Sequence, residues 1–334
     1  MEIQSQVLKQ DRQGLNSVFK KDAALIEKIE TELCNELSDS KGPIREMCNH
    51  ILNSGGKRLR PLLVLYSGML FSDPCEKLIK AAAAAELIHM ASLVHDDVID
   101  NSMLRRNHPS VNCIWGNNFS VLCGDYLFAK AFGILSRYRL IRSMDFMVEA
   151  IQNMCHGEIL QAEDRFCQEI DTNTYYDRIA KKTAIFLSCC CKSGACVGGG
   201  NSVEIDIMGE YGLNIGLAFQ IIDDVLDFCG NPDIMGKPKQ EDLSQGNITI
   251  PVIFLLTSEK YGSWMREIVR RRDFSEHVLN QVYCALLESG AIDDCMKLAE
   301  SHIEKAKQCL KYLPDSPHKE LLYELADALK TRKS

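Results

Sequence analysis

The sequence contains few of the residues that interrupt helices. Of its 334 residues, 21 are glycine and 9 are proline, whereas alanine, leucine, isoleucine, methionine and glutamate are plentiful. This composition favours helices over strands. No stretch rich in proline, glycine or serine divides the chain, so we expect a single all-α domain over residues 1–334, with its best-supported core at residues 40–260.

Features typical of several classes of site and partner are also missing. The net charge is −8 and no basic tract occurs, which argues against a nucleic-acid partner. Although the chain has 15 cysteines, none form a Cys-x-x-Cys pair, so their spacing fits neither a zinc site nor a disulfide framework. We therefore expect reduced, largely buried cysteines in a reducing compartment.

A secretion signal and a membrane-spanning run are not apparent either. The first residues, MEIQSQVLKQDRQ, are polar and include no apolar core segment. The longest apolar runs, near residues 61–71 and 248–256, are too short to cross a bilayer. The expected location is therefore the cytoplasm, with no transmembrane segment.

Long segments without glycine or proline predict helices. One of them, Glu76–Asp100, is apolar on most sides and is therefore predicted to be a buried helix. Thr174 with Asp177 is interpreted as a capping box, and Pro251 suits the first turn of a helix. Residues 101–118 are predicted to be a loop. Other helices are predicted before residue 40, after residue 260, and at 119–138, 142–166, 175–195, 202–229 and 251–260.

An acidic motif occurs twice. DDVID at residues 96–100 recurs as DDVLD at 223–227, each time at the end of a long apolar helix. On a helix, residues four apart share a face, so the first and last aspartates of each motif point the same way. Like charges gathered in this way are destabilising without a cation, and magnesium is commonly held by a few carboxylates plus substrate phosphates. The doubling predicts two facing helices that present acid at one level.

Small basic clusters accompany the two acidic motifs. GGKRLRP at residues 55–61 offers flexible backbone and three cations at the start of a helix, a place suited to anions. Further cations near the motifs are Arg105, Arg106, Lys181, Lys182 and Lys237. Acidic and basic clusters in an otherwise apolar helical chain indicate a substrate that is anionic, bridged by metal ions and attached to an apolar group.

These motifs resemble those of the trans-type polyprenyl diphosphate synthases, in particular the catalytic component of heptaprenyl diphosphate synthases. The resemblance runs from about residue 55 to residue 256 and rests on GGKRLRP (55–61), HMASLVHDDVIDNSMLRR (89–106), GDYLFAKA (124–131), GEILQAED (157–164), KT (182–183), FQIIDDVLD (219–227) and GKPKQEDLSQGNITIP (236–251). It implies an all-helical bundle of the isoprenoid synthase type around a deep central apolar cavity, usually dimeric.

The resemblance also implies a role for each matching residue. Three magnesium ions, which manganese can replace, are expected. Two would be held by Asp96 and Asp100 with Asp97 assisting, and the third by Asp223, supported by Asp224 and Asp227. The allylic diphosphate would be bound by Arg105, Lys182 and Lys237. Isopentenyl diphosphate would be bound by Lys57, Arg60, His89 and Arg106. The developing allylic cation would be faced by the oxygens of Thr183 and Gln220. Asn247 stands where some members have lysine, and His95 is interpreted as structural.

The implied reaction is the successive head-to-tail condensation of isopentenyl diphosphate with an allylic prenyl diphosphate. Ala91, Ser92 and Ile88 lie on the helix that leads to Asp96, and in the family a bulky aromatic at residue 91 or 92 marks short products. The expected product is therefore all-trans and of medium or long chain, hexaprenyl to nonaprenyl, with heptaprenyl favoured. A geranylgeranyl- or farnesyl-length product is the alternative, with the length limit set by other residues.

Two other classes of protein are less well matched. A class I terpene cyclase shares the first acidic motif, but it usually carries an Asn/Ser/Glu-type second motif and needs no isopentenyl site. A non-catalytic partner subunit would not need complete acidic motifs. The sequence does not distinguish a homodimer from a heterodimer with a small regulatory subunit. It also leaves open the primer, the exact product and the end product that the chain serves.

Overall fold

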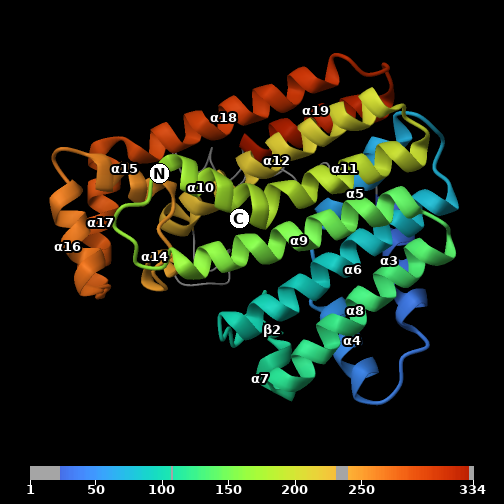
Figure 1. Ribbon diagram of the computed structural model, residues 1–334, viewed down its shortest axis with the longest axis horizontal. Helices are drawn as coiled ribbons and strands as arrows, with labels where there is room; N and C mark the ends of the chain where they lie inside the picture. Colours follow the sequence, from blue (N-terminus) through green and yellow to red (C-terminus); the bar gives the residue numbers. More distant parts are fainter. Residues whose placement is uncertain (1–22, 107, 231–239, 331–334) are drawn as a thin grey trace, which may run out of the picture.

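Helices account for nearly all of the chain that the computed structural model describes, residues 23–106, 108–230 and 240–330 (Figure 1). The helices are α3 (Ala23–Leu37), α4 (Pro43–Asn53), α5 (Leu59–Met69), α6 (Glu76–Ile99), α7 (Val111–Trp115), α8 (Asn117–Arg137), α9 (Ile141–Glu163), α10 (Thr172–Ile179), the π-helical turn η1 (Ala180–Ala184), α11 (Ile185–Gly198), α12 (Ser202–Cys229), α14 (Glu241–Ser244), α15 (Ile250–Thr257), α16 (Gly262–Arg271), α17 (Glu276–Ser289), α18 (Ala291–Leu310) and α19 (Pro317–Lys330). The expected all-α class is confirmed.

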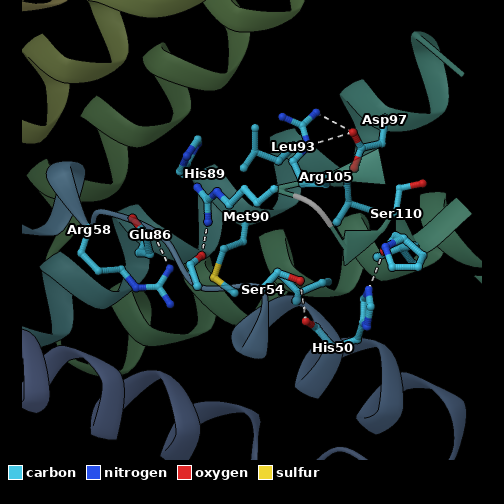
Figure 2. A pocket seen from close by; sticks show the side chains of 16 residues that line it. His50, Ser54, Arg58, Glu86, His89, Met90, Leu93, Asp97, Arg105 and Ser110 are labelled. Atoms are coloured by element: carbon cyan, nitrogen blue, oxygen red, sulfur yellow. Dashed lines mark hydrogen bonds and ion pairs between the residues drawn. The ribbon is translucent and has the colours of Figure 1, made fainter. Parts of the chain in front are cut away.

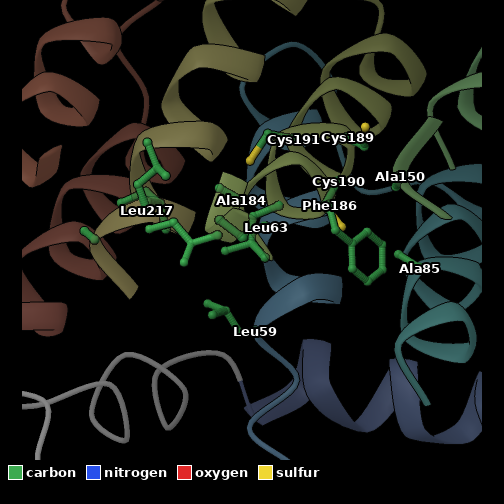
Figure 3. Packing of buried hydrophobic residues seen from close by; sticks show 14 of the residues in the cluster. Leu59, Leu63, Ala85, Ala150, Ala184, Phe186, Cys189, Cys190, Cys191 and Leu217 are labelled. Atoms are coloured by element: carbon green, nitrogen blue, oxygen red, sulfur yellow. The ribbon is translucent and has the colours of Figure 1, made fainter. Parts of the chain in front are cut away.

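The centre of the bundle is α11, which packs against α5, α6, α9 and α12. Small residues allow the close approach to α5. A Cβ atom at Gly194 would lie 2.1 Å from the carbonyl oxygen of Val64, and one at Gly198 would lie 2.2 Å from that of Gly68. Figure 3 shows the cysteine triplet of α11 in this core, where Cys190 is fully buried. Because α11 contacts both α6 and α12, it links the two helices that end in acidic motifs.

The long helix α6 confirms the prediction for Glu76–Asp100. Its alanine run, Ala81–Ala85, is fully buried, so neighbouring helices can approach it on several sides. In Figure 1, α6, α9 and α12 run toward the same end of the bundle, the end at which η1 leads into α11. The last turns of these helices and η1 therefore form one end of the domain, and the acidic motifs lie there.

Within the described part of the chain, two helices are long and apolar enough to match a membrane span by length and composition, α6 and α8. Both are longer than the runs at residues 61–71 and 248–256 considered above. The apolar part of α6 is 67% buried in the bundle, as expected of a core helix, whereas that of α8 is 39% buried. The difference arises because Phe119, Val121 and Leu122 of α8 are exposed.

Several local predictions were wrong. Residues 101–118 contain a two-stranded antiparallel ribbon, β1 (Leu104–Arg105) and β2 (His108–Pro109), followed by α7 and the start of α8. The helix predicted at 175–195 begins at Thr172, and its N-cap is Asp171, whose side chain accepts from the backbone of Thr174. A turn of π-helix, η1, then interrupts the helical run. Such turns are frequent at functional sites because they re-aim side chains.

Other predictions were confirmed. The helix predicted at 202–229 is α12, and its N-cap Asn201 forms a capping box with Glu204. Pro251 lies in the first turn of α15. The cysteines are all free, but they are less uniformly buried than expected, since five are exposed: Cys34, Cys75, Cys113, Cys155 and Cys284. The helix α12 ends at Cys229, as predicted for 202–229, while residues 231–239 lie outside the described part of the chain.

Candidate active site

The first acidic motif forms the last turn of α6 and its C-cap. Asp96 and Asp100 are half-buried, whereas Asp97 is buried. Burial raises the pKa of Asp96 to about 6, with Lys182 opposing that shift and Glu158 adding to it. Burial also raises the pKa of Asp100. Carboxylates held in such surroundings are costly to ionise, so a cation bound between them would stabilise their charged forms.

Cations from two other elements lie beside this motif. Arg105, on β1, donates from Nε to Oδ1 of Asp97 at 2.9 Å. Lys182, in η1, is paired through Nζ with Oε2 of Glu158 on α9 at 2.6 Å. Both predicted diphosphate ligands therefore lie at the acidic end of α6, each held by a carboxylate. Sequence reasoning did not single out Glu158, although it lies in the GEILQAED motif.

Arg165 is a third cation here, and no sequence signal marked it. It lies in the loop after α9, where the backbone N–H of Phe166, at φ +60°, donates to the carbonyl of Gly246 at 2.8 Å. Nη2 of Arg165 lies 3.3 Å from Oδ1 of Asp100. Its Nε is buried and has no hydrogen-bond partner among the described residues. Arg165 reaches the site because this loop folds back toward α6, which is a tertiary effect.

A pocket lies next to the first motif, between α4, the GGKRLRP segment and α6 (Figure 2). Its lining includes His50, Gly55, Glu86, His89, Arg105 and Arg106. Arg106 has φ +52° and donates from Nη1 to the carbonyl of Gly55. This hydrogen bond joins the segment that follows β1 to the glycine pair of GGKRLRP. The pocket thus joins the two predicted diphosphate sites, since Arg105 faces the acidic motif and Arg106 faces the glycines.

Arg60 and His89 are in direct contact. Nη1 of Arg60 lies 3.1 Å from Nε2 of His89, and because a guanidinium can only donate, Nε2 of His89 accepts. Burial, followed by the charge of Arg60, lowers the pKa of His89 well below its usual range, so the ring is neutral with its proton on Nδ1. The Arg60 guanidinium also lies over the ring of Phe186, 5.4 Å from its centroid. These contacts orient both side chains predicted for isopentenyl diphosphate.

Arg58 lines this pocket but is already paired with two carboxylates, contrary to the interpretation of GGKRLRP as three available cations. Its side chain is buried, and it pairs with Glu30 of α3 at 2.6 Å and Glu86 of α6 at 2.8 Å. It therefore fastens the segment to two helices, while Lys57 beside it is exposed. The physical reason lies in the backbone just before α5. Arg58 takes a left-handed conformation there, φ +51°, which turns its side chain toward the protein interior.

The second acidic motif ends α12 in more deeply buried surroundings. Asp223 is half-buried, while Asp224 and Asp227 are buried. Asp224 accepts hydrogen bonds from the hydroxyl of Tyr175 at 2.7 Å and from the side-chain amide of Gln220 at 2.8 Å. Burial, and next the charge of Asp242, raise the pKa of Asp224 to about 7. Tyr175 was missed because a tyrosine at the start of a helix has no distinctive spacing.

The fold brings Thr183 and Gln220 together. These are the two residues whose oxygens are predicted to face the allylic cation. The hydroxyl of Thr183 donates to Oε1 of Gln220 at 2.9 Å. Thr183 belongs to η1 and Gln220 to α12, so the π-helical turn places the lysine–threonine pair between the two motifs. Lys182 reaches toward α9 and the first motif, while Thr183 contacts the second-motif helix.

The donor set fits magnesium better than a metal that needs an all-protein cage. Among the described residues no group of three or more His, Cys, Asp or Glu side chains is placed to hold a metal ion. Magnesium needs no such group, because one or two carboxylates with substrate phosphates and water suffice. Asp96 and Asp100 supply two half-buried carboxylates on one helix face, next to cations that suit phosphate.

The remaining predicted residues are less informative. Ala91 and Ile88 are buried in the core, and Ser92 is half-buried with its hydroxyl on the carbonyl of His89. His95 packs against Gly124 and its Nε2 lies 3.1 Å from the carbonyl of Val121, in agreement with a structural role. Lys237 lies outside the described residues.

Comparisons with known proteins identify the family of this chain. The family model described as polyprenyl synthetase matches residues 41–286. Component 2 of heptaprenyl diphosphate synthase from Geobacillus stearothermophilus is 36% identical over 298 residues, which cover 89% of this chain and 92% of that protein. Octaprenyl diphosphate synthase from Haemophilus influenzae is 29% identical over 95% of this chain and 97% of its own.

Solved structures extend the similarity to the whole fold. Polyprenyl synthase from Caulobacter crescentus, described in complex with calcium and isoprenyl diphosphate, matches with a TM-score of 0.90 and 30% identity, over 96% of this chain and 99% of that one. Heptaprenyl diphosphate synthase from Staphylococcus aureus matches with a TM-score of 0.87 and 31% identity, over 93% and 98%. The chain therefore belongs to the polyprenyl synthetase family and is a prenyltransferase.

Proposed function

We propose that this enzyme condenses isopentenyl diphosphate with an allylic prenyl diphosphate in successive steps and releases an all-trans product of hexaprenyl to nonaprenyl length, with heptaprenyl favoured. The observation that carries the proposal is the meeting of Asp96, Asp100, Arg105 and Lys182 at the end of an apolar helix. Carboxylates that can bind metal ions and cations that can bind phosphate, at the end of an apolar helix, suit a diphosphate that carries an apolar tail.

The allylic diphosphate would be bound at the first motif. Asp96 and Asp100, assisted by Asp97, would hold two magnesium ions, and Asp223, supported by Asp224 and Asp227, would hold a third. When bound, the ions would act as Lewis acids that neutralise the departing diphosphate and weaken its C–O bond. Lys182 would leave its ion pair with Glu158 and bind a diphosphate oxygen instead. Arg105 would extend from Asp97 toward the same diphosphate. Lys237 is a further expected ligand.

Isopentenyl diphosphate would be bound by Lys57, Arg60, His89 and Arg106. Because Nε2 of His89 accepts from Arg60, its Nδ1–H can donate to a diphosphate oxygen. Two neighbouring diphosphate sites hold the double bond of one substrate against the reacting carbon of the other, which replaces an encounter in solution by a fixed approach.

The allylic cation would be stabilised by oxygen dipoles from Thr183 and Gln220. The double bond of isopentenyl diphosphate attacks this cation, a new C–C bond forms, and a proton leaves to the released diphosphate. Water must be excluded, since it would trap the cation as an alcohol. The apolar surroundings of α6 and α12 serve that purpose, and manganese can be expected to replace magnesium in the reaction.

Product length would be set along α6. Ala91 and Ser92 are small and carry no ring that would stop a growing chain near the metals. Relatives named heptaprenyl synthase component 2, at 36% and 33% identity, favour a medium or long product. Geranylgeranyl diphosphate synthase from Methanosarcina mazei is 32% identical, so a short product is the alternative that the assay below must separate.

An assembly through α7, α8 and α9 is part of the proposal. These helices expose large apolar side chains: Ile114, Phe119, Val121, Leu122, Ile141 and Val148. A homodimer would cover them. The name component 2 of two relatives suggests the other assembly, a heterodimer with a small second subunit. A single domain over residues 1–334, a cytoplasmic location and the lack of a nucleic-acid partner stay predictions.

The proposal is tested by incubating the purified chain with magnesium, radiolabelled isopentenyl diphosphate and farnesyl diphosphate. Dephosphorylated products are then separated by chromatography. A ladder that ends between hexaprenyl and nonaprenyl alcohol supports the proposal. Products that stop at geranylgeranyl length favour the short-chain alternative. Cyclic hydrocarbon formed without isopentenyl diphosphate would contradict the proposal in favour of a cyclase.

A further inference from the structure

Four side chains from three elements form a continuous hydrogen-bond relay below the candidate site. Thr183 of η1 donates to Oε1 of Gln220 at 2.9 Å, and Nε2 of Gln220 donates to Oδ1 of Asp224 at 2.8 Å. The hydroxyl of Tyr175, on α10, donates to the other carboxylate oxygen of Asp224 at 2.7 Å. Tyr175 is fully buried, and Thr183 and Asp224 are buried as well.

The direction of the relay follows from the carboxylate at its end. Oδ1 of Asp224 accepts from Nε2 of Gln220, so the amide of Gln220 turns its NH₂ group toward Asp224. Its carbonyl oxygen then points toward Thr183, whose hydroxyl hydrogen is committed to that oxygen. The lone pairs that the relay does not use on Thr183 and Gln220 are consequently acceptors, which suit a positive charge. A reversed amide would present N–H hydrogens instead.

Tyr175 occupies the position that keeps Asp224 in this role. Both oxygens of Asp224 are used, one by Gln220 and one by Tyr175, so the carboxylate is held in a fixed plane. The neighbouring Tyr176 makes a different contact, since its hydroxyl lies 3.4 Å from Nε2 of His302 on α18. The two adjacent tyrosines therefore share a helix and differ in their hydrogen bonds.

We propose that Tyr175 is a positioning residue for the prenyl transfer reaction, acting through Asp224 to direct the oxygens of Gln220 and Thr183 toward the allylic cation. This inference rests on the proposed function. It assigns Asp224 to the orientation of Gln220, in contrast to its outer neighbour Asp223, which is assigned to metal binding. Tyr175 itself touches no reacting atom, because Asp224 and Gln220 separate it from Thr183.

The experiment compares Tyr175→Phe with Tyr176→Phe, which removes the adjacent hydroxyl and serves as the matched control. Tyr175→Phe should lower kcat by about ten- to a hundredfold, the range that one hydrogen bond to a charged group supplies. KM for both substrates should change less than about twofold, because an interaction used mainly in the transition state lowers kcat. Calorimetry should show unchanged binding of magnesium pyrophosphate, a readout that requires no turnover.

The double variant sharpens the test. Asp224→Asn removes the charge that directs the relay, so adding Tyr175→Phe to it should cause little further loss of kcat. If Tyr175→Phe did not fold, Asp224→Asn would carry the test, with the same expected loss of kcat.

Three results would overturn the inference: an unchanged kcat in Tyr175→Phe, an equal loss in Tyr176→Phe, or weakened binding of magnesium pyrophosphate in Tyr175→Phe. The last would mean that the hydroxyl serves the metal site. Failure of the proposed function is distinguished by the parent enzyme, which would then elongate no allylic primer. In that case the relay could have no role in condensation, whatever its effect on folding.

Discussion

The two acidic motifs have nearly the same sequence, DDVID and DDVLD, but the protein surrounds them differently. At the first, Asp97 holds a cation, Arg105, and further cations lie close by. At the second, Asp224 accepts from two neutral donors, Tyr175 and Gln220. The difference suggests that the two motifs have different roles. The first lies next to cations that can bind phosphate, whereas the second orients the neutral side chains of Gln220 and Thr183.

The comparison also separates the residues within each motif. Asp96 and Asp223, the first aspartates, are half-buried. Asp97 and Asp224, the second aspartates, are buried and already hydrogen-bonded. An aspartate that is one residue further along a helix is turned about 100° away, so adjacent carboxylates leave the helix in different directions. The pattern is therefore better understood as an outer metal-facing set and an inner positioning pair.

The largest effect is expected for the outer aspartates, where the two motifs should behave alike. Asp96→Ala or Asp223→Ala should lower turnover on the order of a thousandfold or more, since each removes a ligand from a metal that stabilises the leaving group. Steady-state kinetics with helical circular dichroism checks this, and removal of magnesium by a chelator should have the same effect. Asp145→Ala, an exposed aspartate on α9, is the control. Near-normal turnover without a metal ion would contradict the metal-dependent mechanism.

The inner aspartates should separate the motifs by which kinetic constant changes. Asp97→Asn loosens Arg105 and should raise KM for the allylic substrate by about tenfold, as expected when a charge-assisted hydrogen bond is lost. Asp224→Asn should instead lower kcat and leave that KM nearly unchanged. Varying each substrate in turn measures both constants. The same kinetic signature in the two variants would remove the distinction drawn between the motifs.

A smaller effect is expected for a cation that belongs to neither motif. Lys57→Ala should raise KM for isopentenyl diphosphate by several-fold to about tenfold, because one exposed charge on a diphosphate contributes modestly. KM for farnesyl diphosphate should change much less. Lys41→Ala, also exposed, is the matched control. A larger effect on the allylic substrate would reverse the assignment of the two diphosphate sites.

The smallest effect on rate, but a large one on product, is expected along α6. Ala91→Phe touches no ligand, so the first condensation should continue, while overpacking the tail path costs about 1–3 kcal/mol and stops elongation early. Farnesyl and geranylgeranyl products should dominate from a short primer. Ser92→Phe is the companion, since residue 92 lies four residues before Asp96 and on its face. Parent-length products from both variants would move the length limit to another helix.

Helix content could be predicted from local sequence because composition and periodicity act over short distances. The segment 202–229 became α12, and Glu76–Ile99 became α6, since each is a largely apolar segment without proline that runs far longer than a strand. The break at Ala180–Ala184 was not predicted, because nothing in AKKTA disfavours an α-helix. The ribbon at residues 104–109 was also missed, as two-residue strands have no detectable alternation.

The candidate site divides in the same way. Spacing alone put Asp96 and Asp100 on one helix face, and residue chemistry alone made GGKRLRP an anion-binding segment. Tertiary contacts decided that Arg58 turns inward to Glu30 and Glu86, that Arg165 reaches Asp100, and that Tyr175 completes the relay to Gln220. These partners lie far apart along the chain. A helix face is set by bonds between near neighbours, whereas the partner of a charge or hydroxyl depends on how whole helices pack.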